Sequence, residues 1–364
     1  MSARSGRLFA LVSLVALLVC VRVSGEGAPA GLPDRLTDSE FWALTGQLSE
    51  PGGHFRSDNL VSNELHYPEV LRDLTRRVPP GSVYLGVGPE QNFSYIASTR
   101  PAMAFVVDVR RGNLHLHLMY KALFELSVDR VDFVSRLFTK PRPPDLRADA
   151  PVGDIMGAFW QTDTSAREVF ERNVRDVQTH LTRTRGLPLS DDDLAGVADI
   201  YFAFYWYGPS ITYGSSSTAA FRRRSTITFH DLMLSADDTG QVASFLATDD
   251  AFRFVKQLHS RNMLVPVVGD FGGATALRAV GQYLRRHDAT VGAFYLSNVE
   301  QYLRQQGTHR AFCANIASLP LEPRSTFIRS QSMGGGFRNS LGPMMAETSA
   351  CLGSADRHLP VGTQ

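Results

Sequence analysis

Glycines and polar residues at the ends of apolar runs are the part of this sequence whose types and spacing could do chemistry. One apolar run passes into Gly86 and Gly88, followed by Glu90 and Asn92. Glycines between a buried strand and a helix let the backbone approach a ligand and direct helix N–H groups at it. Asp108 lies 20 positions after Gly88 and closes a second apolar run. An acid there can accept hydrogen bonds from the ribose hydroxyls of a nucleotide.

Two later apolar runs also end in polar residues. Asp270 follows the run 264–269, and Asn298 follows the run 291–296, which contains Tyr295. Polar residues at the carboxyl ends of successive parallel strands line the ligand crevice of an open α/β sheet. Capping of the following helix is the alternative for Asp270 and Asn298, because Asp and Asn are preferred there. For Asp108, the alternatives are a cap or an ion pair with a neighbouring arginine.

The elements that would position these residues follow from the apolar pattern. The runs 83–87, 104–109, 264–269 and 291–296 do not alternate and are bounded by Gly and Pro, as is typical of parallel strands buried on both faces. Helical spacing between them indicates βα units and a parallel sheet. We therefore predict an α/β fold: a Rossmann-like, doubly wound, mostly parallel sheet with a long helical insertion between its second and third strands. The four runs should be parallel neighbours, with their carboxyl ends on one face.

The domain organisation follows from this pattern and from shifts in composition. We expect a signal peptide at 1–30, an N-terminal helical segment at 31–80, the first half of the Rossmann-like domain at 81–128, a mostly helical insertion at 129–262, the second half at 263–333, and a flexible C-terminal tail at 334–364.

Composition limits the classes of partner. The chain of 364 residues has 43% hydrophobic residues and a net charge of +1, which suits a globular protein and gives no reason to expect a nucleic-acid partner. His115 and His117 are next but one to each other and point to different helix faces, so no metal site is expected. Nothing in the sequence indicates an oligomeric state.

The order of these parts resembles the class I S-adenosylmethionine-dependent methyltransferases. In that family a glycine loop follows strand one, an acid ends strand two, a polar residue follows strand three and strand four ends at the substrate. Gly86, Gly88, Asp108, Asp270 and Asn298 match those places in order. Tyr84 stands where the family usually carries an acid, and a long segment separates Asp108 from Asp270.

The resemblance implies S-adenosylmethionine as cofactor, bound by the residues of the glycine loop and the second and third strand ends: Gly86, Gly88, Glu90, Asn92, Asp108 and Asp270. It places Tyr295 and Asn298 nearest the reacting methyl group, as the catalytic candidates. We expect a methyltransferase-like protein with a small-molecule ligand and no metal. Since S-adenosylmethionine is a cytoplasmic metabolite, export would separate an enzyme from it. The alternative is therefore a non-catalytic exported binding module.

The first residues have the pattern of a secretory signal. Arg4 and Arg7 precede an apolar run over residues 8–21, and Ala28-Pro29-Ala30 offers small residues for cleavage. The run is shorter than the ~20 residues of a spanning helix, so we expect cleavage near Gly31, an exported location (periplasmic or extracellular) and no membrane span in the mature chain. An uncleaved anchor is the alternative.

Cleavage would leave Cys313 and Cys351. Two thiols in an exported protein can form a disulfide. The alternative is that Cys313, in an apolar run expected to be a strand, is a small buried hydrophobic residue.

Overall fold

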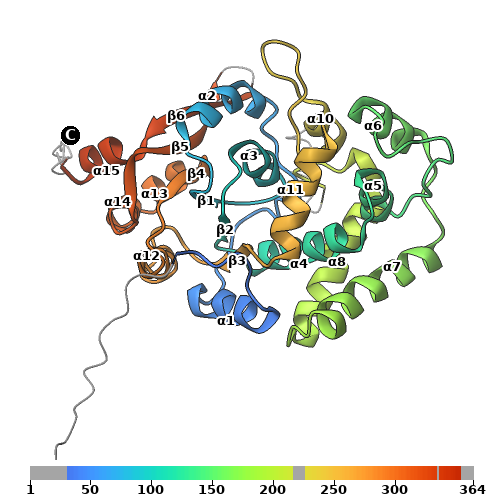
Figure 1. The fold of residues 1–364 in the computed structure, drawn as a ribbon, viewed down its shortest axis with the longest axis horizontal. Helices are drawn as coiled ribbons and strands as arrows, with labels where there is room; N and C mark the ends of the chain where they lie inside the picture. The colour runs from blue at the N-terminus through green and yellow to red at the C-terminus, as the bar shows by residue number, and fades with distance from the viewer. Residues whose placement is uncertain (1–30, 216–225, 334–335, 354–364) are drawn as a thin grey trace, which may run out of the picture.

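A computed structural model describes residues 31–215, 226–333 and 336–353 (Figure 1). The expected signal peptide and residues 354–364 lie outside the described residues. Six strands form one sheet in the order β3-β2-β1-β4-β5-β6. Their bounds are β1 (Val83–Gly86), β2 (Met103–Asp108), β3 (Leu264–Val268), β4 (Val291–Ser297), β5 (Leu321–Met333) and β6 (Gly336–Pro343). The fold is therefore α/β with a mostly parallel sheet.

The first four strands are parallel neighbours, as the sequence predicts. β1 pairs with β2 on one side and β4 on the other, and β2 pairs with β3. Every residue of β1, β2 and β3 is buried, which explains why these runs are continuously apolar instead of alternating. β5 joins β4 in parallel, and β6 returns antiparallel along β5. The carboxyl ends of β1 to β4 consequently lie at one edge of the sheet.

Helices cover both sides of this sheet in Figure 1, with α2, α3 and α11 on one side and α1, α12 and α14 on the other. The elements around the sheet are α1 (Asp38–Leu48), η1 (Tyr67–Val70), α2 (Leu71–Arg77), α3 (Gln91–Thr99), α4 (Arg111–Leu126), α12 (Ala276–Arg286), α13 (Val299–Gln305), α14 (His309–Ala317) and α15 (Met344–Gly353). No helix in residues 31–215, 226–333 and 336–353 is long and apolar enough to cross a membrane.

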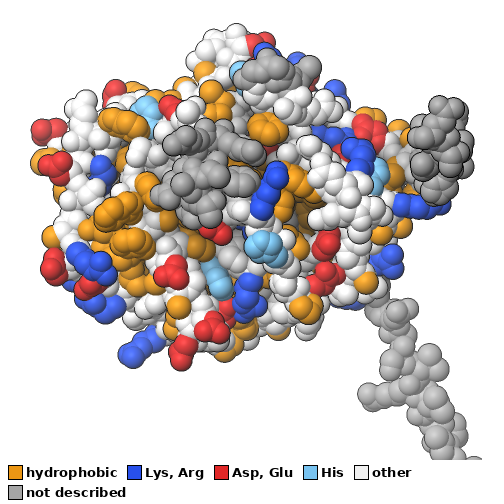
Figure 2. All heavy atoms as spheres, turned by 180° about the vertical axis from the view of Figure 1, so that it is seen from behind, with side chains coloured by type: hydrophobic (Ala, Val, Ile, Leu, Met, Phe, Trp, Pro, Cys, Tyr) orange, Lys and Arg blue, Asp and Glu red, His pale blue; other side chains and the backbone are white. Residues whose placement is uncertain are grey.

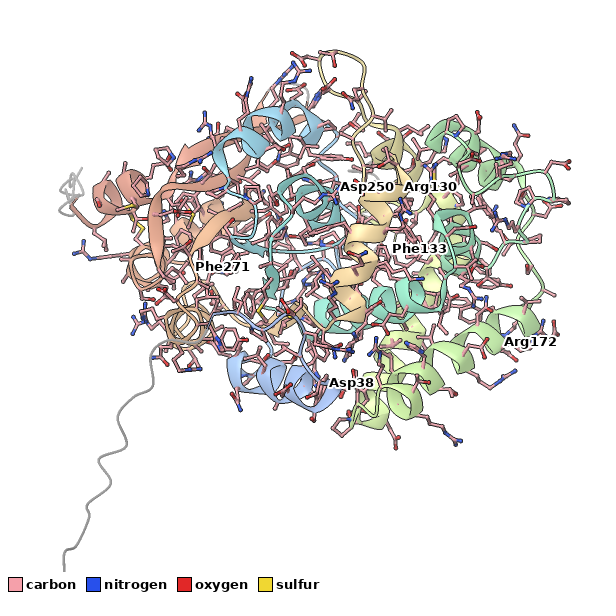
Figure 3. The ribbon with its side chains drawn as sticks, in the orientation of Figure 1. Asp38, Arg130, Phe133, Arg172, Asp250 and Phe271 are labelled. Atoms are coloured by element: carbon pink, nitrogen blue, oxygen red, sulfur yellow. A yellow bond between two sulfur atoms is a disulfide. The ribbon has the colours of Figure 1, made fainter. Side chains whose placement is uncertain are left out.

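A helical layer lies between β2 and β3 in the chain, as predicted. It comprises α5 (Arg130–Phe138), α6 (Val152–Gln161), α7 (Arg167–Thr179), η2 (His180–Thr184), α8 (Asp191–Tyr207), η3 (Gly208–Ser210), α10 (Phe229–Leu234) and α11 (Asp249–Ser260). Figure 3 shows Arg130 and Phe133 between α5 and α11. The Phe133 ring lies 5.5 Å from that of Phe252. Arg130, 4% exposed, donates to the Asp249 carboxylate at 2.8 Å.

The N-terminal segment is held against the edge strand β3. Thr37 and Glu40 form a capping box that starts α1. Beyond α1, the backbone N of Glu50 donates to the carbonyl of Val268 at 2.7 Å. Val268 N in turn donates to the Ser49 hydroxyl at 3.0 Å. The segment thus supplies hydrogen-bond partners at the outer edge of the sheet.

Two expectations about the C-terminal part are wrong. Cys313 lies in helix α14 and not in a strand, because Phe312 and Ile316 follow a four-residue helical spacing and are buried together. The expected flexible tail is instead ordered over residues 336–353, which form β6 and α15. A disulfide between Cys313 and Cys351, with the Cα atoms 6.3 Å apart, ties α15 to α14.

Candidate functional site

A cavity of about 550 Å³ lies at the carboxyl ends of β1 to β4. The loop over residues 53–64 forms one wall, α13 another, and Tyr213 contributes from the helical layer. Of the residues predicted from the sequence, the lining includes Gly88, Asp108, Asp270, Tyr295 and Asn298. The prediction that these strand ends meet in one place is therefore confirmed, although what the cavity binds is a separate question.

Gly86 and Asn92 shape the glycine loop and do not line the cavity. The Tyr84 hydroxyl donates to Asn92 Oδ1 at 2.9 Å, and Asn92 Nδ2 donates to the carbonyl of Pro89 at 2.6 Å. A Cβ atom on Gly86 would overlap Asn92 Oδ1. Tyr84 thus forms part of an internal brace with Asn92. The structure does not support cofactor contacts for Gly86 and Asn92, because both are enclosed by this brace.

Gly88 is the glycine that faces the cavity. Its φ of +75° is unfavourable for side chains with a Cβ, and no atom lies within 4 Å of where a Cβ would be. Its carbonyl accepts a hydrogen bond from His117 Nε2 at 2.9 Å. Burial lowers the pKa of His117 to about 4, so the imidazole is neutral at pH 7. Its hydrogen bond holds the glycine loop in place.

Asp108 forms a buried ion pair with Arg110. The Arg110 Nη2 atom donates to Asp108 Oδ2 at 2.7 Å, while Arg110 Nε and backbone N donate to Oδ1 at 2.9 Å each. Burial acts to lower the pKa of Arg110, but the Asp108 carboxylate outweighs it and the pKa is raised. A carboxylate offers about four acceptor positions. Asp108 therefore keeps about one position for a ligand and not the two that a ribose diol would use.

Asp270 and the start of α12 are also engaged by protein groups. Asp270 Oδ1 accepts from the backbone N of Gly272 at 2.8 Å. The Glu50 carboxylate accepts from the backbone N atoms of Thr275 and Ala276, at 2.7 and 2.8 Å. Glu50 therefore occupies the position at the helix N-terminus where an anionic ligand would otherwise be favoured.

A buried carboxylate that the sequence analysis missed lies beside the end of β4. Glu64, 2% exposed, accepts hydrogen bonds from Gln91 Nε2 at 3.0 Å, from Asn339 Nδ2 at 2.8 Å and from the Ser297 hydroxyl. Ser297 has a φ of +49°, which is uncommon for a residue with a Cβ and is often found at functional sites. Glu64 lies in a loop without periodicity, so its partners could be found only in three dimensions.

Tyr295 lies next to this carboxylate. The side chain is 3% exposed, and its ring packs 4.9 Å from that of Tyr95. Burial, followed by the charge of Glu64, raises the pKa of Tyr295 well above its ordinary value. Tyr295 therefore stays a neutral phenol at physiological pH, and its hydroxyl interacts with Glu64 and Ser297. Asn298 lines the cavity at the start of α13 without capping it through its side chain.

Glu90 is enclosed beneath the glycine loop and is not part of the cavity lining. It is fully buried; Oε1 accepts from the backbone N of Ser62 at 3.1 Å, and Oε2 has no hydrogen-bond partner among the described residues. Burial raises the pKa of Glu90 to about 7. The structure does not support a cofactor contact for Glu90. Instead, it links α3 to the loop that forms one cavity wall.

Aromatic and basic side chains lie at the side of the cavity formed by α13. Arg56 Nη2 donates to the Tyr302 hydroxyl at 2.9 Å, and the Phe55 ring meets that of Tyr302 edge-on at 5.1 Å. Basic and acidic side chains are mixed over the face of the molecule shown in Figure 2. In α8, Tyr201 and Phe204 are fully buried, whereas Phe202 and Trp206 are exposed.

A comparison with protein-family models gives a match. The family described as "Domain of unknown function (DUF7790)" matches residues 60–187 and 216–344, which include the glycine loop and all six strand regions. No curated protein matches the chain. The matched segments span more than half of the sequence, so the chain belongs to the family of the domain of unknown function DUF7790.

Proposed function

We propose that this protein binds a small molecule of the adenosyl class in the cavity at the carboxyl ends of β1 to β4, in the manner of a methyltransferase with a Rossmann-like, doubly wound sheet. The observation that carries the proposal is that Gly88, Asp108, Asp270, Tyr295 and Asn298 line a single cavity. The strand order with an antiparallel edge strand is compatible with that class. A volume of about 550 Å³ falls in the range of small-molecule sites.

The residues present fit an adenosyl ligand in part. Gly88 leaves open space next to the loop backbone, and Asp108 retains about one acceptor position beside its pair with Arg110. Such a position suits one ribose hydroxyl, with Asp270 and the buried Phe271 on the side of the base. S-Adenosylmethionine, when bound, would supply an activated methyl group.

The role of this chain in methyl transfer would be alignment and exclusion of water. Tyr295 would form the cavity floor as a neutral phenol held by Glu64 and Ser297, and Asn298 would orient the acceptor from the start of α13. Glu64 would hold Ser297, and with it the end of β4, through the hydrogen bond between them. None of these side chains needs to change its protonation state.

The second candidate is a non-catalytic binding module. Two observations favour it: Arg110 occupies three acceptor positions of Asp108, and Glu50 covers the N-terminus of α12. Export to the periplasm or the cell exterior, which we propose on the N-terminal pattern, favours it too, because S-adenosylmethionine is cytoplasmic.

Calorimetry with the purified protein tests the first proposal. S-Adenosylmethionine, S-adenosylhomocysteine and adenosine should each release or absorb heat on titration. Asn298→Trp, which would fill the cavity, should abolish this binding, while Gln282→Trp on the exposed side of α12 should not. No binding of the three ligands at millimolar concentration would sink the adenosyl proposal. Binding without methyl transfer to any offered nucleophile would favour the non-catalytic module.

A further inference from the structure

A histidine lies against the disulfide where α14 and α15 meet. His309 is one helical turn before Cys313, and its Nδ1 atom lies 4.0 Å from Cys313 Sγ and 3.7 Å from Cys351 Sγ. The three ligand atoms lie within 4.8 Å of one another, and no other group in the described part of the chain has the potential to hold a metal ion in this way. The sequence analysis named no metal ligands, although the spacing of His309 and Cys313 on a helix was a usable signal.

We propose that reduction of the Cys313–Cys351 disulfide converts this cluster into a Zn²⁺ site with the ligands His309 Nδ1, Cys313 Sγ and Cys351 Sγ. Zinc bonds of about 2.3 Å to sulfur and about 2.0 Å to nitrogen, at tetrahedral angles, place N and S roughly 3.6 Å apart. The two N–S distances in the structure are close to this value. Only the two sulfur atoms have to separate, to about 3.8 Å.

A carboxylate behind the histidine supports the same assignment. His309 Nε2 and Glu300 Oε1 are 3.3 Å apart, which allows Nε2–H to donate and leaves the Nδ1 lone pair directed at the sulfur atoms. Glu300 is fixed in turn by an ion pair with Arg329. Zinc-bound histidines almost always have such a partner for the second ring nitrogen, which sets the tautomer and ring orientation.

Three protein ligands leave a fourth coordination position open. Cys313 is buried, whereas the His309 side chain is 23% exposed and Cys351 is half-buried. Solvent can therefore reach the cluster from the side of His309 and Cys351. A water molecule in the fourth position would complete a tetrahedron, as in zinc sites with three protein ligands.

The change between the two states balances with a dithiol as reductant. The dithiol transfers two electrons and two protons, the S–S bond breaks to give two thiols, and the dithiol becomes a disulfide. Zn²⁺ then binds both sulfur atoms as thiolates and two protons are released. In the oxidised state neither sulfur is a thiolate, so the site is closed to the metal.

Titration with Co²⁺, a spectroscopic substitute for Zn²⁺, tests this proposal on the full-length protein. After reduction by a dithiol and its anaerobic removal, one Co²⁺ per chain should bind with visible d–d bands and thiolate charge-transfer absorption. One equivalent of Zn²⁺ should abolish these bands and protect Cys313 and Cys351 from alkylation. The oxidised protein should give no such bands. Absence of the bands in the reduced protein, or equal binding in both states, would overturn the proposal.

Variants separate a metal ligand from a structural histidine. His309→Asn should lose most of the Co²⁺ affinity and Glu300→Gln about 10- to 100-fold, while the oxidised forms of both still fold, as judged by their melting curves. His66→Asn is the matched control, because His66 also pairs with a glutamate, Glu69, but lies outside the cluster. Unchanged affinity in His309→Asn would contradict the assignment. These results do not depend on whether the cavity binds an adenosyl ligand.

Discussion

Arg110 donates three hydrogen bonds to the carboxylate of Asp108 at the end of β2, two from its guanidinium and one from its backbone N, and both side chains are less than 10% exposed. The same arginine reaches the carbonyl oxygens of Ser57 and Asp58 in the cavity wall. The ion pair therefore connects the sheet to the loop and makes Asp108 a structural residue, whether or not it also contacts a ligand.

Asp108→Asn should lower the free energy of unfolding by about 3–5 kcal/mol, because it leaves a buried guanidinium without its counter-charge. Urea denaturation at pH 7 measures this change. Asp149→Asn, which breaks the exposed pair with Arg147, is the control and should change the free energy of unfolding far less, because water screens an exposed ion pair. If Asp108→Asn kept its stability but no longer bound an adenosyl ligand, the structural role of Asp108 would be contradicted and its role would be ligand binding alone.

Stability should depend on pH through Glu90. Its folded pKa is raised to about 7 from an ordinary value of 4.5, so folding favours the protonated form. The stabilisation is full below pH 4.5 and is lost as the pH rises to 7, by roughly 3 kcal/mol in total. Unfolding free energies of the wild type and Glu90→Gln should therefore differ in slope over this interval. His117, whose pKa is lowered to about 4, contributes a slope of the opposite sign. Both proteins keep His117, so its contribution cancels when the two curves are compared.

Glu69→Gln, on the exposed side of η1, should reproduce the pH slope of the wild type. Parallel curves for the wild type and Glu90→Gln would show that Glu90 titrates normally and that solvent reaches it.

The two loop glycines should respond differently to alanine. Gly86→Ala places a methyl group against Asn92 Oδ1 and should cost about 1–3 kcal/mol of stability by overpacking. Gly88→Ala has open space and only the unfavourable φ, which costs about 1 kcal/mol. Thermal melting ranks the two, and calorimetry of Gly88→Ala should show weaker ligand binding. If Gly88→Ala were the less stable variant, the side chains of Tyr84 and Asn92 would have to move aside at little energetic cost.

Arg130 should be a stability determinant of the helical layer. Besides Asp249, it donates to backbone carbonyls of residues 148, 150, 246 and 247. Arg130→Met should lower the unfolding free energy by about 2–4 kcal/mol, since several buried acceptors lose a charged donor. Arg167→Met, at an exposed pair with Glu171, is the control and should change stability by less than about 1 kcal/mol. Equal effects would mean that water replaces the Arg130 donors.

The strands and the residues at their ends could be predicted from sequence because burial on both faces leaves continuous apolar runs. Asp108 and Asp270 were placed correctly by that argument, since β2 and β3 are neighbours. Which of the predicted residues face the cavity could not be inferred. Gly86 and Gly88 are alike in sequence, and only the packing of Asn92 distinguishes them.

Other features were missed for different physical reasons. Short apolar runs fit a strand or a helix equally well, so the run around Cys313 was assigned to the wrong element. Glu64 depends on partners from β4 and β6 that are more than 200 residues away in the chain. Hydrogen bonds to a buried carboxylate from residues so distant in the chain leave no local sequence pattern.

The contact of Ser49 and Glu50 with β3 has a consequence for solubility. β3 is an outer strand of the sheet, and an outer strand with free backbone N–H and C=O groups is a template for pairing with another molecule. Ser49 accepts from the backbone N of Val268, and Glu50 N donates to its carbonyl. Because these backbone groups of β3 are already hydrogen-bonded, the N-terminal segment opposes edge-to-edge aggregation. A chain shortened to begin after Glu50 would keep every strand of the sheet and still be prone to self-association.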